Sequence, residues 1–266
     1  MKQKEITGIV ETLFKTINKL LPKILKEFNA DDIHEFRIAV KKLRAFLRLV
    51  KANDKEGKAT LPKQLKTFYG YIGIIRNVQL QKHAIFKYVT EYKIEQPKTY
   101  IQILDEEKSY WEKQAADLMT DNSFKDNEHG ILKKLPAKLE KSTTKRFLKT
   151  RLTGLKAQLK NMKEDNPIHT VRKILKDILY NLHYLVPEHL PKPVSKEEDL
   201  KLLTKQLGDF RDKCIQLELL SDEYLDKVAD ANEKQLLLQM KENFLHEKHS
   251  MMEQLASVCT NMFEKI

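Results

Sequence analysis

Apolar residues recur at helical spacing along most of the chain, and short polar stretches separate the runs. Positions i, i+3, i+4 and i+7 filled with apolar residues are typical of amphipathic helices that bury one face. The predicted helices run near residues 4–28, 32–52, 61–93 and 98–120, and near 142–163, 167–186, 196–222 and 230–262. Helices joined by short loops pack antiparallel, so we expect an all-α fold with two tandem four-helix bundles.

Polar and turn-forming residues mark the breaks between these helices. The breaks fall at Asn29 to Asp31, at Asn53 to Thr60, around Pro97 and at Pro187 to Pro193. Residues 121–136, which contain Gly130 and Pro136, are the expected linker between the halves. The predicted division is therefore 1–120 and 137–266, and the two parts together form one unit.

The second half repeats the first. A shift of 135 residues aligns them without a gap through the most informative region, and the matched pairs are His34/His169, Arg37/Arg172, Lys41/Lys176, Gly73/Gly208 and Arg76/Arg211. Apolar periodicity alone does not place His, Arg and Gly at matched positions. The pattern indicates a tandem duplication.

The second predicted helix of each half carries cations on one face. At 100° per residue, a wedge of roughly 80° collects His34, Arg37, Lys41, Arg44 and Arg48. The same wedge of the second copy holds His169, Arg172, Lys176 and His183. A lone basic stripe is often only a solvated helix face. Its recurrence favours a binding site, although two copies of one ancestral surface helix would look the same.

These two helices begin with capping residues, Asp31 in one and Asn166 followed by Pro167 in the other. His34 and His169 follow in the first turn, where the helix dipole disfavours a charged imidazole. We therefore expect two neutral histidines. They either donate hydrogen bonds to an anion or hold the structure.

The third predicted helix adds further cations. Lys66 and Arg76, like Lys201 and Arg211, are ten residues apart and are expected to share a face. Asp212 follows Arg211 and is expected to orient a basic side chain, and Asn77 is its counterpart. Gly73 and Gly208 each cost a helix about 1 kcal/mol relative to Ala. Glycines at matched sites therefore indicate close approach of another helix or of a ligand to the backbone, and we favour the helix.

Composition supports this picture. The chain has 266 residues but only 7 Gly and 8 Pro, which suits long helices. Its net charge of +11 indicates anionic partners such as nucleic acid, phosphate polymers or an acidic membrane surface. Cys214 and Cys259 lie in no CxxC pattern and are expected to be reduced thiols of a cytoplasmic protein. The apolar runs are too short to span a bilayer, so no membrane insertion is expected.

At these positions the sequence resembles the CHAD family, the conserved-histidine α-helical domain. The resemblance rests on four motifs: His34-x-x-Arg37-x-x-x-Lys41-Lys42-x-Arg44; His169-x-x-Arg172-x-x-x-Lys176 with Tyr180; Leu200-Lys201…Leu207-Gly208-Asp209-Phe210-Arg211-Asp212; and its weaker copy Leu65-Lys66…Ile72-Gly73-Ile74-Ile75-Arg76-Asn77. Together they cover nearly the whole chain. Leu179 departs from the family pattern, which usually has arginine there, and Asn77 departs from the usual aspartate.

The resemblance implies two bundles related by pseudo-two-fold symmetry and a central basic groove that binds inorganic polyphosphate or another polyanion. We further expect a monomer, located in the cytoplasm and associated with polyphosphate granules. The expected binding residues are His34, Arg37, Lys41, Lys42, Arg44, Arg48, Lys66, Arg76, His169, Arg172, Lys173, Lys176, Lys201 and Arg211, supported by Asp212 and Asn77.

Rival functions are weaker on the sequence. Zinc needs three or four converging ligands, and one histidine per half supplies at most two, so we expect no metal and no cofactor. The chain has no Gly-rich phosphate loop, nucleophile elbow or HExxH motif, so we expect no enzyme. Nucleic-acid binding stays open because tyrosines that could stack bases lie nearby: Tyr69, Tyr71, Tyr180 and Tyr184. A scaffold for acidic protein partners is a third possibility.

Overall fold

The computed structural model describes residues 1–53, 59–119, 123–185, 188, 190, 194 and 196–264. Throughout these residues the secondary structure is helical, without a β-strand, and an isolated bridge joins Lys2 to Lys138. The predicted all-α fold is confirmed. In the described ranges no helix is both long and apolar enough to cross a membrane.

The eight predicted helices are all present, close to their expected bounds. In the first half they are α1 (Gln3–Glu27), α2 (Ala30–Lys51), α3 (Lys63–Tyr92) and α4 (Lys98–Leu118). In the second half they are α6 (Lys141–Leu159), α7 (Asp165–Asn181), α9 (Glu197–Glu218) and α11 (Ala231–Phe263). The structure adds α5 (Lys125–Leu132), a 3-10 turn (Leu182–Tyr184) and α10 (Asp222–Leu225).

Several local expectations were wrong. The cap of α2 is Asn29, whose side chain accepts from the backbone N–H groups of Asp31 and Asp32, because the helix begins one residue before Asp31. Helix α7 begins at Asp165, ahead of Asn166. It also ends at Asn181, so His183 lies in the 3-10 turn and leaves the predicted wedge.

Residues 121–136 contain more structure than a linker requires. Helix α5 packs against α1, and Phe124 is buried with its ring 6.1 Å from Phe36 and 5.6 Å from Phe68. Residues 121 and 122 lie outside the described part of the chain. Residues 54–58 of the expected break at Asn53 to Thr60, and most of the expected break at Pro187 to Pro193, also lie outside it. The division into 1–120 and 137–266 stays a proposal about the duplication.

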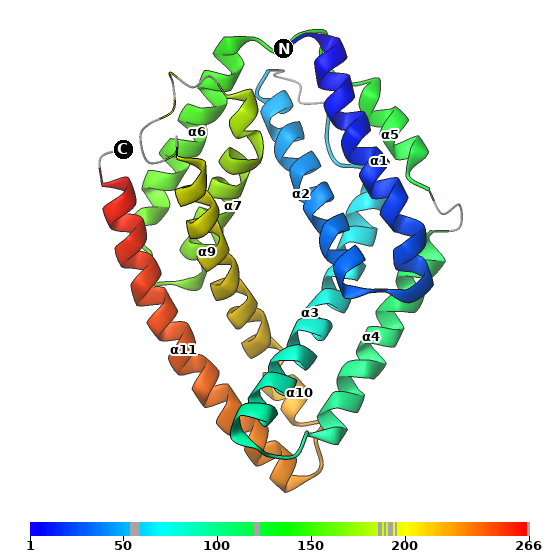
Figure 1. Ribbon diagram of the computed structural model, residues 1–266, viewed down its shortest axis with the longest axis vertical. Helices are drawn as coiled ribbons and strands as arrows, with labels where there is room; N and C mark the ends of the chain where they lie inside the picture. The colour runs from blue at the N-terminus through cyan, green and yellow to red at the C-terminus, as the bar shows by residue number, and fades with distance from the viewer. Residues whose placement is uncertain are drawn as a thin grey trace.

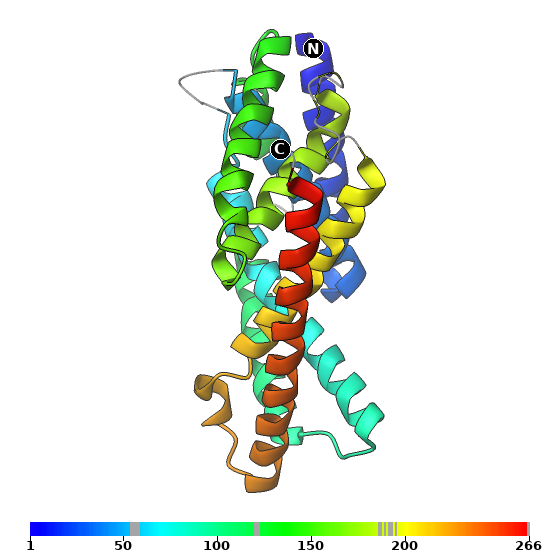
Figure 2. The same cartoon turned by 90° about the vertical axis from the view of Figure 1, so that its left-hand side faces the viewer.

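The helices follow one another as packed neighbours (Figure 1). Helix α1 packs chiefly on α2, and α3 on α4, while α6, α7, α9 and α11 pack in succession. The halves meet where α2 packs on α7 and where α3 packs on α9. Seen from the side, α11 runs along most of the long axis (Figure 2).

Two hydrophobic cores are shared between the halves. One extends from Ile6 to Phe263 and includes residues of both halves. The other joins α3 and α4 to the region of α9, α10 and α11, where the Tyr100 hydroxyl donates to the Leu219 carbonyl at 2.5 Å. Because each of these cores includes residues of both halves, the chain is one packed unit.

Candidate functional site

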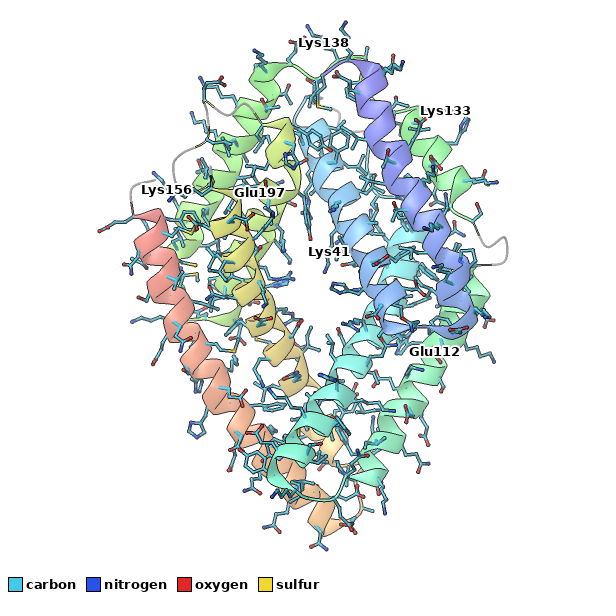
Figure 3. All side chains as sticks on the ribbon, in the orientation of Figure 1. Lys41, Glu112, Lys133, Lys138, Lys156 and Glu197 are labelled. Carbon is cyan, nitrogen blue, oxygen red and sulfur yellow. The ribbon has the colours of Figure 1, made fainter. Side chains whose placement is uncertain are left out.

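Where the halves meet, a cavity of about 490 Å³ opens between α2, α3, α7 and α9. Its size is typical of ligand sites. Nine arginines and lysines line it against two aspartates, Asp177 and Asp212. The cations are Arg37, Lys41, Arg44, Arg48, Arg76, Arg172, Lys173, Lys176 and Arg211. His34, His169, Tyr69, Tyr180 and Asn77 also line this cavity, which we call the basic groove. Figure 3 labels Lys41 beside it, at the centre of the molecule.

An arginine lies over the matched glycine in each half. A Cβ on Gly73 would stand 2.5 Å from an Arg37 guanidinium nitrogen, and one on Gly208 would stand 3.7 Å from Arg172. Gly73 therefore makes room for an arginine side chain rather than for a neighbouring helix, which corrects our interpretation there, whereas a Cβ on Gly208 would make only ordinary contact with Arg172. Arg37 also donates to the Tyr69 carbonyl at 3.0 Å.

The Tyr69 ring organises two of these cations. The guanidinium carbons of Arg37 and Arg44 lie 4.4 and 4.7 Å from its centroid. Cations over an aromatic face are attracted by the ring quadrupole. Tyr69 therefore holds two arginines close together although they repel each other.

Burial and crowding of cations shift the titration of Lys41. Burial first, and then the charges of Arg37, Arg172 and Lys176, together lower the pKa of Lys41 to about 7, against the opposing effect of Asp212. An ordinary lysine titrates near 10.4. The groove therefore stores an unfavourable charge interaction that an anion would relieve.

Both histidines have lowered pKa values. Burial is the largest cause for both. Arg76 and Lys41 lower the pKa of His34 further. For His169, burial together with Lys173 and Arg211 lowers the pKa to about 4. Both imidazoles are therefore neutral at neutral pH, as expected. The expected cause was the helix dipole, whereas the causes found are burial and nearby cations. His169 Nδ1 is buried without a hydrogen-bond partner among the described residues.

The two aspartates play different parts. Burial raises the pKa of Asp212, and Asp209 adds to the rise, whereas Arg172, Lys41 and Arg76 oppose it. Asp212 thus faces cations from three helices, which fits the predicted orienting role. Asp177 is buried and binds Arg48 at 2.7 and 3.0 Å, with Arg151 of α6 at 3.4 Å.

The second half contributes less positive charge. Arg211 pairs with Glu218 at 2.9 Å, whereas Arg76 makes a longer contact of 3.4 Å with the Ala30 carbonyl. The position aligned with Glu218 is His83. Likewise Asp177 aligns with Lys42, and Leu179 with Arg44. The groove is therefore built by both halves but is more strongly cationic on the first.

Three predicted residues lie outside the groove: Lys42, Lys66 and Lys201. Ten residues turn a helix about 80° short of three full turns, so Lys66 and Lys201 do not share a face with Arg76 and Arg211. Both are exposed, and Lys201 pairs with Glu197 and Glu198. Lys42 is one residue round the helix from Lys41 and lines a neighbouring cavity.

Sequence reasoning missed Asp177 and the part played by Tyr69. Asp177 left a signal, because it places an acidic residue within the basic motif of the second copy. The stacking of two arginines on Tyr69 left none, since it depends on how α2 and α3 pack. In the described ranges no group of three or more His, Cys, Asp or Glu is arranged to hold a metal ion.

A groove lined by cations from two helical halves defines the class as an all-α protein with a central basic groove. The family model described as CHAD domain matches residues 8–221, which is most of the chain. The chain belongs to the CHAD domain family.

Solved structures share this fold at low sequence identity. The crystal structure of the CHAD domain from the plant Ricinus communis has a TM-score of 0.74 and 13% identity, and the alignment covers 100% of this chain and 92% of that one. PptA from Streptomyces chartreusis has a TM-score of 0.69 and 13% identity, with 99% of each chain covered. No curated protein matches the sequence.

Proposed function

We propose that the chain binds inorganic polyphosphate in the basic groove and catalyses no reaction. The observation that carries the proposal is the convergence of nine arginines and lysines from both halves on one cavity. Polyphosphate carries about one negative charge per phosphate and has no base edges. A cationic track rich in arginine suits it, because guanidinium groups engage phosphate oxygens in pairs.

The surroundings of the tyrosines favour polyphosphate over nucleic acid. Tyr69 carries Arg37 and Arg44, and Lys176 lies 5.4 Å from the Tyr180 ring centroid. Tyr71 packs on Trp111, and Tyr184 packs on Phe46. Each ring already has a partner, so these tyrosines do not form the row of open faces on which bases stack. Nucleic acid or an acidic protein would have to bind by charge alone.

The charged groups of the groove support binding rather than catalysis. Asp177 binds two arginines, and Asp212 faces three cations. Burial and nearby cations lower the pKa of both histidines. Among the described residues of the groove, neither aspartate is thus placed beside a nucleophile that it would activate. Because one chain completes the groove, we propose a monomer, located in the cytoplasm and associated with polyphosphate granules.

A competition experiment tests the ligand. The protein is loaded with a fluorescent single-stranded RNA and titrated with polyphosphate at equal concentrations of charge, and then the order is reversed. Polyphosphate should displace the RNA at far lower concentration than the reverse. Equal competition, or displacement of polyphosphate by RNA, contradicts the proposal and favours the nucleic-acid alternative.

A further inference from the structure

Helix α6 carries a second concentration of positive charge, outside the groove. No Asp or Glu occurs from Lys141 to Lys163. At 100° per residue, one wedge of about 100° collects Lys141, Lys145, Lys149, Lys156 and Lys160, which we call the outer lysine face. All five are exposed. Within the described ranges, α6 makes its ion pair through Arg151, which binds Asp177 of α7 on the side of α6 that faces α7.

The duplicated half shows that such a face is not needed for the fold. Helix α1 packs on α2 as α6 packs on α7, yet α1 mixes its lysines with Glu5, Glu11 and Glu27. Lysines four residues apart on a helix repel one another, and α6 has three such pairs on this face. A face of one sign therefore weakens the empty protein, and an anionic partner would reverse that effect.

The outer lysine face lies one helix layer away from the groove. Helix α6 packs on α7, which contributes Arg172 and Lys176 to the groove. Packed helix axes are about 8–10 Å apart. Figure 3 labels Lys156 at the outer edge of the molecule and Lys41 at its centre. A chain that leaves the groove beside Asp177 can reach the far side of α6.

We propose that the outer lysine face binds the part of a long polyphosphate chain that extends beyond the groove. This inference rests on the proposed function. Lysine ammonium groups act as mobile point charges and suit a flexible polyanion that needs no fixed geometry. Once the groove holds one segment, the rest of the chain is at high effective concentration near α6, so weak contacts there add strongly to affinity.

The same face fits a membrane poorly. Helices that lie in a membrane interface insert large apolar side chains between the lipids. The exposed large apolar residues of the described chain lie outside α6: Phe86, Tyr92, Ile94, Tyr110, Leu202, Leu238, Leu245 and Val258. Charge is therefore the property by which this face would recognise a partner.

The test compares two triple charge reversals. One is Lys145→Glu with Lys149→Glu and Lys156→Glu on α6. The control is Lys4→Glu with Lys15→Glu and Lys19→Glu on α1, whose lysines are also exposed and whose net charge changes equally. Affinity for long-chain polyphosphate should fall about tenfold more in the α6 variant than in the control. The slope of log K against log salt should become shallower by about 2, and tripolyphosphate should bind both variants alike.

Each other outcome overturns the inference. An equal loss for long chains in the two variants means that only net charge matters. An α6-specific loss with tripolyphosphate means that the reversal disturbs the groove. If the α6 variant loses RNA or anionic phosphatidylserine vesicles but keeps long polyphosphate, the face serves another partner. Failure of the unmodified protein to bind any polyphosphate would instead refute the proposed function, and this inference with it.

Discussion

At the scale of single residues, the matched glycines give the sharpest contrast between the halves. A methyl group on Gly73 would collide with the Arg37 guanidinium, whereas one on Gly208 would make ordinary contact with Arg172. Gly73→Ala should therefore displace Arg37 and lower polyphosphate affinity several-fold. Gly208→Ala should leave affinity unchanged. Gly208→Ala should raise the free energy of unfolding by up to about 1 kcal/mol through helix propensity, and Gly73→Ala by less, because Arg37 must also leave its place against Tyr69.

Titration calorimetry and urea denaturation measure the two effects separately. Gly208→Ala controls for the change in helix propensity, because it makes the same substitution at the aligned position. Equal affinities for the two variants would mean that the position of Arg37 over Gly73 has no part in binding.

Lys41 should make binding depend on pH. Its pKa of about 7 in the empty groove means that it is only partly charged at neutral pH. A bound anion favours the charged form, so binding should take up protons, and affinity should fall as pH rises through 7. Calorimetry at pH 7 in buffers of different ionisation enthalpy measures the uptake. Lys41→Met should remove most of this proton uptake. If the uptake is undiminished in Lys41→Met, the protons are taken up by other groups, such as the histidines.

The same pKa shift affects folding with a definite sign. The pKa of Lys41 is lower in the folded than in the unfolded chain, so the unfolded chain binds more protons between about pH 7 and 10. The contribution of Lys41 to stability therefore rises with pH across that window, and Lys41→Met should flatten the rise.

At the scale of elements, Asp177 ties three helices together. It binds Arg48 of α2 and Arg151 of α6 from its own position on α7. Asp177→Asn should leave two arginines without their counter-charge and lower the free energy of unfolding by about 1–3 kcal/mol, since both arginines are partly exposed. It should also free Arg48 and raise polyphosphate affinity. Urea denaturation without and with polyphosphate tests both parts, and unchanged stability would contradict the role of Asp177.

Element by element, the sequence predicted the helices well and their mutual arrangement less well. Periodicity located α2 and α7, and the matched histidines and arginines identified their groove-facing sides. The ten-residue spacing predicts nearly the same face for Lys66 and Arg76 and for Lys201 and Arg211, but the rotation falls about 80° short of three full turns, and neither lysine lines the groove. The outer lysine face was visible as the absence of acidic residues between Lys141 and Lys163.

Other features could not be predicted because they depend on packing between elements. The position of Arg37 over Gly73 requires the particular approach of α2 to α3. Helix α5 forms within a polar stretch because Phe124 and Ile131 find buried places in the larger of the two shared cores. The pairing of Arg48 with Asp177 joins residues 129 positions apart.

At the scale of the whole molecule, the groove exists only where the two halves are packed together. Its cations come from α2 and α3 on one side and from α7 and α9 on the other. The shared cores fix this arrangement in the empty protein. The cations are thus held together in the empty protein, and a bound polyanion such as the proposed polyphosphate would relieve their repulsion. Removing some of them should leave stability level or raise it.

The most direct test of one shared site measures short-chain polyphosphate affinity for two double variants, Arg37→Gln with Lys41→Gln, and Arg172→Gln with Lys176→Gln. Each should weaken binding by at least about tenfold, because each removes two charged contacts to phosphate. Each should also reduce the salt slope by about 1.4. Lys66→Gln with Lys201→Gln, outside the groove, should change affinity little. The account is contradicted if either groove pair can be replaced in a folded protein without loss of affinity, because one half alone would then bind the ligand.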